Sequence, residues 1–372
     1  MDSTDVGSLP LEGDRDRFLR GASHAKEAKS KLNEETLRDV VYFEATVTHG
    51  LLDKLGAGLT VPTYPQFRDM NEMFLSMFSG LKRLEGRYVE VAGLGVKDPR
   101  IPEVLVVREA ARELAEELGL DKVRIRVCIT GPHTLSFQFA FRSPGLLRRL
   151  GHVLAKVAET NLASDKHFEV AMLTVDEPTF GTVDDRLLER GSEGREALLE
   201  AWEEILRPAR AKGIITCFHL HSTIDDLFWQ VENLRLVESH VGDPLYGLEE
   251  TKALLDRHDK ALRASICKAD FDELVRARIK AEFPDASEAV MAERLGEAWK
   301  AIRAGRLDPI SFIEDVKVMA KRLREILKRF GSERVPFAGP ECGLRGFPAY
   351  GSAIECLRRV VRACQEASGS GY

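Results

Sequence analysis

The fold is decided by the stretch Gly213-Ile214-Ile215-Thr216-Cys217-Phe218-His219-Leu220-His221, an apolar strand that runs into a pair of histidines. Side chains of alternate residues in a β-strand point to the same side, so the two imidazoles share one face. In α/β barrels, catalytic groups project from the carboxyl ends of buried parallel strands. The stretch therefore predicts such a strand, with His219 and His221 at a functional site.

Further apolar runs alternate with long amphipathic helical patterns, which predicts parallel strands joined by crossover helices. The predicted strands cover residues 4–6, 58–61, 123–129, 169–175, 213–219, 234–237, 262–266 and 335–338. Eight strands predict a (β/α)8 TIM barrel, which we expect to be a single α/β domain over residues 1–367. Residues 87–94 predict an additional hairpin, residues 283–307 a helical insertion, and residues 368–372 a flexible tail.

Composition narrows the class of protein. The chain has 372 residues, of which 44% are hydrophobic and 31% charged, and it lacks a stretch of ~18 apolar residues that could span a membrane. Lys and Arg number 54 against 60 Asp and Glu, so the net charge of -6 gives no reason to expect nucleic acid as a partner. The six cysteines form no CxxC pair, and no signal segment is recognisable at the N-terminus. We expect a soluble cytoplasmic protein.

Two other strand ends supply metal-binding side chains. Glu238 closes the apolar run 234–237, and Cys342 follows the run 335–338. With His219 and His221 they offer two nitrogens, one carboxylate and one thiolate, which is a tetrahedral zinc set if the strand ends converge. Zinc would hold a substrate thiol as thiolate near neutral pH, whereas a free thiol with a pKa of about 8.5 is mostly protonated. Zinc with an exchangeable position could alternatively activate water.

Polar residues also follow the first, third and fourth predicted strands. Ser8 and Thr130 add hydroxyl groups to glycine- and proline-containing turns, which predicts substrate-binding positions. Asp176 and His133 are candidate catalytic residues. Asp176 could alternatively cap the following helix.

Three further side chains lie near the predicted barrel mouth, where ordinary loop or core packing is the favoured interpretation of each; they are His133, His240 and Tyr246.

Six motifs occur in order along the whole chain; they are Gly7-Ser8-Leu9-Pro10, Thr130-Gly131-Pro132, Asp176-Glu177-Pro178, the histidine strand, Glu238 and Gly339-Pro340-Glu341-Cys342-Gly343-Leu344. Together they resemble the catalytic domain of cobalamin-independent methionine synthase. A chain of this length resembles the short core form of that enzyme in archaea and some bacteria. That family is a (β/α)8 barrel related to uroporphyrinogen decarboxylase, in which zinc activates the homocysteine sulfur. The resemblance implies that His219, Glu238 and Cys342 bind zinc. It also implies that Ser8 holds the carboxylate of the acceptor and that Asp176 contacts its amino group.

Three departures from the family pattern bear on the chemistry. The family has His-x-Cys where this chain has His219-Leu220-His221, so the ligand shell is less negative, which lowers both the pKa and the nucleophilicity of a bound thiol. After the second strand the expected glutamate is absent and Arg68 is close by, and a guanidinium suits a carboxylate or sulfonate. The family's catalytic histidine has no counterpart in residues 265–270.

These observations predict a zinc-dependent methyltransferase that transfers a methyl group from a methylated corrinoid protein or a methyl-pterin to a small thiol. Homocysteine is one candidate acceptor; another thiol such as coenzyme M is favoured by Arg68. A metal-dependent hydrolase on the same barrel is one alternative, and a non-catalytic, zinc-stabilised binding protein is another.

Overall fold

The computed structural model describes residues 1–369. Residues 370–372 of the predicted flexible tail lie outside the described residues, while Ser368 and Gly369 form a turn after the last helix.

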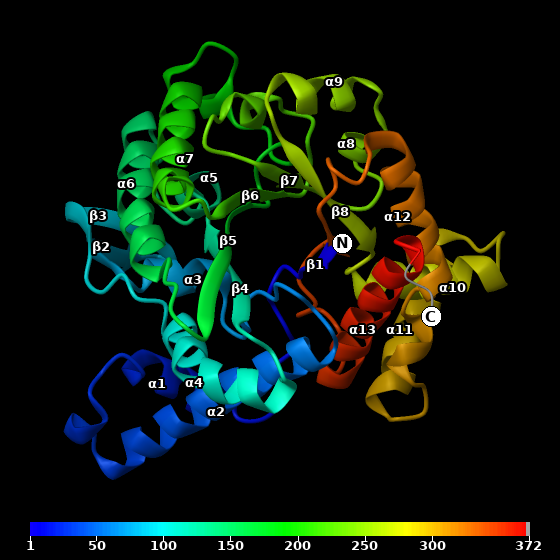
Figure 1. Cartoon of the computed structure of the whole chain (residues 1–372), viewed down its shortest axis with the longest axis horizontal. Coiled ribbons are helices and arrows are strands. Elements are labelled where there is room, and N and C mark those ends of the chain that lie inside the picture. Colours follow the sequence, from blue (N-terminus) through cyan, green and yellow to red (C-terminus); the bar gives the residue numbers. More distant parts are fainter. Residues whose placement is uncertain (370–372) are drawn as a thin grey trace.

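Seven strands form one curled parallel sheet in the order β1-β9-β8-β7-β6-β5-β4. Their bounds are β1 (Asp2–Ser3), β4 (Val123–Thr130), β5 (Phe168–Glu177), β6 (Ile215–Leu220), β7 (Leu236–Glu238), β8 (Ala261–Cys267) and β9 (Phe337–Pro340). Helices surround this sheet (Figure 1). The predicted α/β barrel is therefore confirmed.

The segment 60–66 closes the gap between β1 and β4. Its Val61 N–H donates to the Ser3 carbonyl at 3.0 Å, and the Arg126 N–H on β4 donates to the Pro62 carbonyl at 2.9 Å. Proline has no N–H to donate, so Pro62 and Pro65 keep this segment from pairing as a regular strand. In place of the predicted strand 58–61, the irregular segment 60–66 thus occupies the eighth strand position of the barrel.

Helices cover the outside of the barrel. Their bounds are α1 (Arg15–His24), α2 (Glu34–Gly56), α3 (Met70–Leu75), α4 (Pro102–Leu118), α5 (Pro132–Ser136), α6 (Pro144–Asn161), α7 (Glu193–Ala211), α8 (Pro244–Gly247), α9 (Glu250–Arg257), α10 (Phe271–Glu282), α11 (Glu288–Arg303), α12 (Val316–Phe330) and α13 (Tyr350–Ala367), with 3-10 turns η1 (Lys29–Lys31), η2 (Arg186–Leu188), η3 (Leu227–Gln230) and η4 (Pro309–Phe312). Side chains cap the first turns of several of them; at α7, for example, Ser192 accepts the Arg195 N–H.

Two additions decorate the barrel. The antiparallel hairpin β2 (Phe78–Leu84) and β3 (Arg87–Val96) lies beside α6 (Figure 1), where residues 87–94 predicted a hairpin arm. Helix α11 occupies the predicted insertion between α10 and α12.

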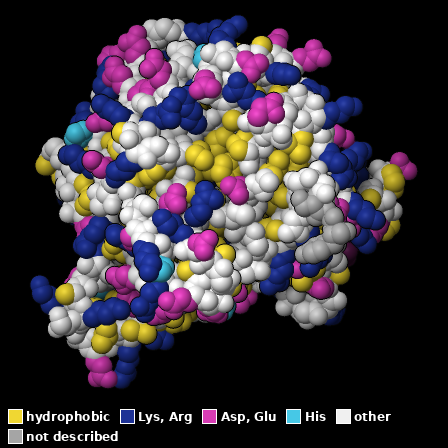
Figure 2. Space-filling view, in the orientation of Figure 1, with side chains coloured by type: hydrophobic (Ala, Val, Ile, Leu, Met, Phe, Trp, Pro, Cys, Tyr) yellow, Lys and Arg dark blue, Asp and Glu magenta, His cyan; other side chains and the backbone are white. Residues whose placement is uncertain are grey.

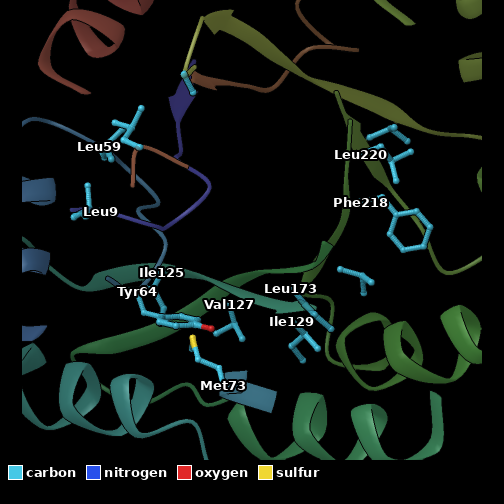
Figure 3. Packing of buried hydrophobic residues seen from close by; sticks show 14 of the residues in the cluster. Leu9, Leu59, Tyr64, Met73, Ile125, Val127, Ile129, Leu173, Phe218 and Leu220 are labelled. Atoms are coloured by element: carbon cyan, nitrogen blue, oxygen red, sulfur yellow. The ribbon is translucent and has the colours of Figure 1, made fainter. Parts of the chain in front are cut away.

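Because side chains alternate along each strand, some face the helices around the sheet and the others face the inside of the barrel. Outward-facing side chains such as Phe218 and Leu220 pack between the sheet and the helices, and Figure 3 shows them on one side of β6. Inward-facing side chains form a separate apolar cluster at the amino ends of the strands, made of Val61, Ala171, Met172, Cys217, Leu236 and Phe337. Toward the carboxyl ends of the strands the inward-facing side chains are polar. The barrel interior is therefore apolar at the amino ends of the strands and polar at their carboxyl ends.

Within residues 1–369, no helix combines the length and apolar character that crossing a bilayer requires. On the face shown in Figure 2, acidic and basic side chains intermix around a central patch of hydrophobic ones.

Candidate metal centre

The candidate site is built on the register of three neighbouring strands. Asp176 on β5 pairs with His219 on β6, and His219 pairs with Glu238 on β7. These three residues therefore form one row inside the barrel, and all are almost completely buried. The residue two positions after each of these, such as His221 after His219, points to the same side and lies at the mouth of the barrel, because alternate residues share a face.

Four side chains converge at that mouth, namely His219, His221, His240 and Cys342. One potential ligand atom from each lies within 4.8 Å of those of the other three. The Cys342 Sγ is 3.6 Å from the Nε2 of His221 and 3.8 Å from the Nε2 of His219. Three of the four predicted ligands, from β6 and from the loop after β9, are thus brought together.

Glu238, the fourth predicted ligand, is not a member of this group. Its Oε1 contacts the Nδ1 of His219 at 2.9 Å and Arg126 at 2.6 Å, while its Oε2 lies 2.9 Å from Arg263. Burial would raise the pKa of Glu238, but Arg126 and Arg263 outweigh it and hold that pKa well below its usual range. The carboxylate is an ionised partner that fixes the His219 ring, so that Nε2 faces the cluster. His240 is the fourth member of the group, in the place that the sequence predicted for Glu238.

His240 and His221 both offer nitrogen atoms suited to a cation. The Nε2 of His240 is buried, and among the residues that the structure describes it has no hydrogen-bond partner. Burial, together with nearby His219 and His240, lowers the pKa of His221 to about 2, so its imidazole is neutral. Neutral imidazoles with free lone pairs are what a divalent transition metal requires.

Cys342 contributes a sulfur that is protonated in the protein alone. Burial raises the pKa of its thiol to about 12. Only a cation in the cluster would make the thiolate stable there, since a bound metal deprotonates a coordinating thiol. Three imidazoles and one thiol therefore fit a metal ion of the zinc type by donor chemistry. The buried Nε2 of His240 also fits it, because no residue in the range 1–369 is its hydrogen-bond partner.

The carboxyl group of Asp176 lies in the barrel beside this cluster. Its Oδ1 is buried, and no described residue hydrogen-bonds to it. Burial raises the pKa of Asp176 to about 8, although Arg126 opposes this. Asp176 does not cap a helix through that oxygen, and it has capacity left to exchange a proton or to bind a polar group of a ligand.

Ser8 lies against the loop that carries Cys342. Its carbonyl accepts the Leu344 N–H at 2.8 Å. A Cβ atom placed on Gly343 would be 1.9 Å from the Ser8 Oγ, so glycine is what permits this approach. The predicted substrate-binding serine is thus adjacent to the cluster of His219, His221, His240 and Cys342.

The side chains of Thr130 and His133 form hydrogen bonds that connect neighbouring parts of the fold. The Thr130 hydroxyl donates to the Met70 carbonyl at 2.9 Å, at the start of α3. His133 is fully buried, with its Nδ1 3.0 Å from the Thr179 hydroxyl and its Nε2 3.0 Å from Asp185. Both ring nitrogens therefore have partners, which matches the packing interpretation of His133 better than the catalytic one.

Arg68 is paired with Glu103 and lines a different cavity from the one beside the cluster. Two hydrogen bonds of 2.7 Å join its guanidinium to the fully buried Glu103 carboxylate. Because its charge is already neutralised, the physical reason to expect an anionic acceptor at Arg68 disappears.

A cavity of about 630 Å³ adjoins the cluster and is lined in part by His221, His240 and Cys342. Sequence reasoning placed His240 near the barrel mouth but did not predict this cavity or the position of His240 in the cluster. A signal was present, since Glu238-Ser239-His240 repeats on β7 the two-residue spacing of His219-Leu220-His221 on β6.

Comparisons with known proteins place the fold. No family model matches the chain, and no curated protein matches it. Among solved structures, a B12-independent methionine synthase from Shewanella sp. W3-18-1, in complex with selenomethionine, is similar over 99% of this chain and 98% of its own, with a TM-score of 0.62 and 15% identity.

Two further structures are similar over nearly the whole chain. A putative vitamin-B12 independent methionine synthase from Listeria monocytogenes has a TM-score of 0.58 at 15% identity, covering 98% of both chains. A methyltransferase from Methanosarcina mazei has a TM-score of 0.52 at 14% identity, covering 98% of this chain and 94% of its own. At these identities the likeness shows a shared fold.

Proposed function

We propose that this protein is a zinc-dependent methyltransferase that transfers a methyl group to the sulfur of a small thiol. The observation that carries the proposal is the cluster of three imidazoles and one thiol, within 4.8 Å of one another, at the carboxyl end of an α/β barrel. The fold is shared with structures described as B12-independent methionine synthases and as a methyltransferase, which supports this choice of reaction.

The proposed ligands are His219, His221, His240 and Cys342. Nitrogen and sulfur donors in a group of four are typical of zinc sites. When bound, zinc supplies a means of keeping a substrate thiol as thiolate at neutral pH.

The other residues orient and protect the reaction. Glu238 accepts the Nδ1 proton of His219 and so fixes the ring that presents Nε2 to the cluster. Asp176, with its unpartnered oxygen, binds a polar group of the acceptor or holds a proton beside it. The cavity next to Cys342 receives the reactants and brings thiol and methyl group together, and fixed geometry of that kind can lower a barrier by ~7–11 kcal/mol.

The proposed methyl donor is a methylated corrinoid protein or a methyl-pterin, following the family resemblance. The proposed acceptor is homocysteine or another small thiol. Pairing of Arg68 with Glu103 withdraws the argument that favoured a sulfonated or carboxylated thiol such as coenzyme M.

The test is metal analysis of the purified protein, followed by zinc-edge X-ray absorption with and without candidate thiols. We expect about one zinc per chain. When the acceptor thiol is added we expect a second sulfur neighbour that takes the place of one of the four protein ligands, because those four already fill a tetrahedral shell. A protein that binds no zinc would contradict the proposal. Zinc whose coordination is unchanged by every thiol, in a protein that hydrolyses esters or amides, would contradict it too and favour the hydrolase.

A further inference from the structure

The cavity beside the metal cluster has a charge that selects its ligand. Its walls include the carboxylates of Asp270, Asp272, Glu273 and Glu341, and among the described lining residues there is no lysine or arginine. Glu341 is 5% exposed, and its two oxygens accept the N–H groups of Val241 at 2.8 Å and Ala269 at 2.9 Å.

Nearby cations offset only part of this charge. Lys268 lies 3.0 Å from Glu273, outside the cavity wall, and Arg303 stands 5.6 Å from the ring centre of Trp299. Asp270 accepts a hydrogen bond from the backbone N–H of Glu273, and Asp272 accepts one from the Trp299 indole. The cavity therefore has an excess of negative charge.

Two aromatic residues also line the cavity. Phe271 begins α10 and Trp299 comes from the inserted helix α11, and their ring centres are 5.4 Å apart at an angle of 58°. Aromatic faces combined with carboxylates recognise organic ammonium ions, because the ring faces attract a cation and the methylated or alkyl surface packs on them.

The cavity also opens directly on the cluster. His221, His240 and Cys342 line the same space as Trp299 and Asp272, and the buried Nε2 of His240 has no partner among the described residues. A ligand held by the acidic and aromatic wall would therefore have its other end at the candidate metal.

We propose that this cavity binds the ammonium-bearing end of a reactant, so that one substrate of the enzyme carries an organic ammonium group. This deepens the proposed function and rests on it for the identity of the reaction. It reverses the charge expected from Arg68. The inserted helix α11, through Trp299, then belongs to the substrate site.

The test uses calorimetric titration of the full-length, metal-free protein with choline, cysteamine and dimethylbutanol, the last being an uncharged isostere of choline. We expect choline and cysteamine to bind at least tenfold more tightly than dimethylbutanol. Asp272→Asn keeps an oxygen that can accept the Trp299 N–H, and we expect it to weaken choline binding about five- to tenfold. Glu273→Gln is a second variant should the first fold poorly, and Glu297→Gln, on the exposed side of α11, is the matched control with unchanged binding.

Equal affinity for choline and dimethylbutanol, or choline binding that neither Asp272→Asn nor Glu273→Gln weakens, would overturn the inference. Because the titration needs no metal, it separates the two proposals. Discrimination by charge in a protein that takes up no zinc would remove the proposed function and leave the cavity's ligand class standing. Sulfur binding at zinc without charge discrimination would do the reverse.

Discussion

The Nδ1 of His219 lies 2.9 Å from the Oε1 of Glu238, and the same carboxylate lies between Arg126 and Arg263. One side chain therefore joins the candidate metal centre to the charged interior of the barrel. The arrangement follows from strand register, since His219 and Glu238 are direct partners on β6 and β7.

We predict that zinc in this protein is bound by three imidazoles and one sulfur. His240→Ala should remove one imidazole from the zinc-edge X-ray absorption spectrum and weaken zinc binding at least tenfold, because the Nε2 of His240 is one of four converging atoms. The measurement is spectroscopy of the zinc-loaded variants together with competition against a chelator. An unchanged imidazole count in His240→Ala, with an oxygen neighbour lost in Glu238→Gln, would restore Glu238 as the ligand.

Glu238→Gln should lower the free energy of unfolding by roughly 3–5 kcal/mol, because it leaves two buried guanidinium groups facing a neutral amide. The glutamine fills the same space, so the loss reports charge. Denaturant unfolding of the metal-free proteins measures it, with Glu297→Gln as an exposed control expected within about 0.5 kcal/mol of the parent. A loss no larger than that of the control would mean that the arginines find other partners.

The sequence allowed the barrel, the hairpin and three of the four clustered side chains to be predicted, because each depends on local periodicity. Alternation places His219 and His221 on one face, and an apolar run followed by glycine and proline predicts the strand end before Cys342. These features need only the rule that parallel strands end at one rim.

The rest depended on pairings that no local pattern contains. Glu103 lies 35 residues from Arg68 along the chain, yet it neutralises that guanidinium with two hydrogen bonds. Whether Glu238 or His240 faces the cluster depends on Arg126 and Arg263, which enter the barrel from β4 and β8. Long-range ion pairs of this kind are decided by packing, and only coordinates reveal them.

Lys260 gives the protein a pH-dependent stability in the alkaline range. Burial lowers the pKa of this lysine to about 8, and its ammonium donates to the carbonyls of Val231 at 2.6 Å and Leu234 at 3.2 Å. Between about pH 8 and the unfolded value near 10.4, the unfolded chain binds more protons at this site, so the free energy of unfolding rises with pH there.

The expected contribution of Lys260 is on the order of 3 kcal/mol across that window, since each pKa unit corresponds to about 1.4 kcal/mol. Lys260→Met should remove this rise. The difference in free energy of unfolding between parent and variant should therefore shift in favour of the parent as the pH increases from about 7.5 to about 10. Urea unfolding at the two ends of the window measures it, with the exposed Lys317→Met as control. A constant difference between parent and Lys260→Met at both ends would refute the role given to this lysine.

Gly343→Ala should disturb the metal centre through Ser8. The new Cβ would be 1.9 Å from the Ser8 Oγ, and since Gly343 follows Cys342 directly, the loop has to move or Ser8 has to rotate. Overpacking of this kind typically costs about 1–3 kcal/mol of stability, and a sulfur displaced from its three imidazoles should bind zinc about tenfold more weakly. Gly346→Ala in the same loop is the matched control, because a Cβ there meets nothing within 4 Å.

A second substitution at the same contact makes the cause identifiable. Ser8→Ala deletes the Oγ, after which the nearest atom to the new Cβ is the Ser8 Cβ at 3.1 Å. The double variant Ser8→Ala, Gly343→Ala should therefore recover most of the zinc affinity that Gly343→Ala loses, measured against Ser8→Ala alone in a chelator competition. If the two substitutions are instead additive, the Ser8 hydroxyl is not what constrains the loop, and Cys342 is held in place by the remainder of its own strand end.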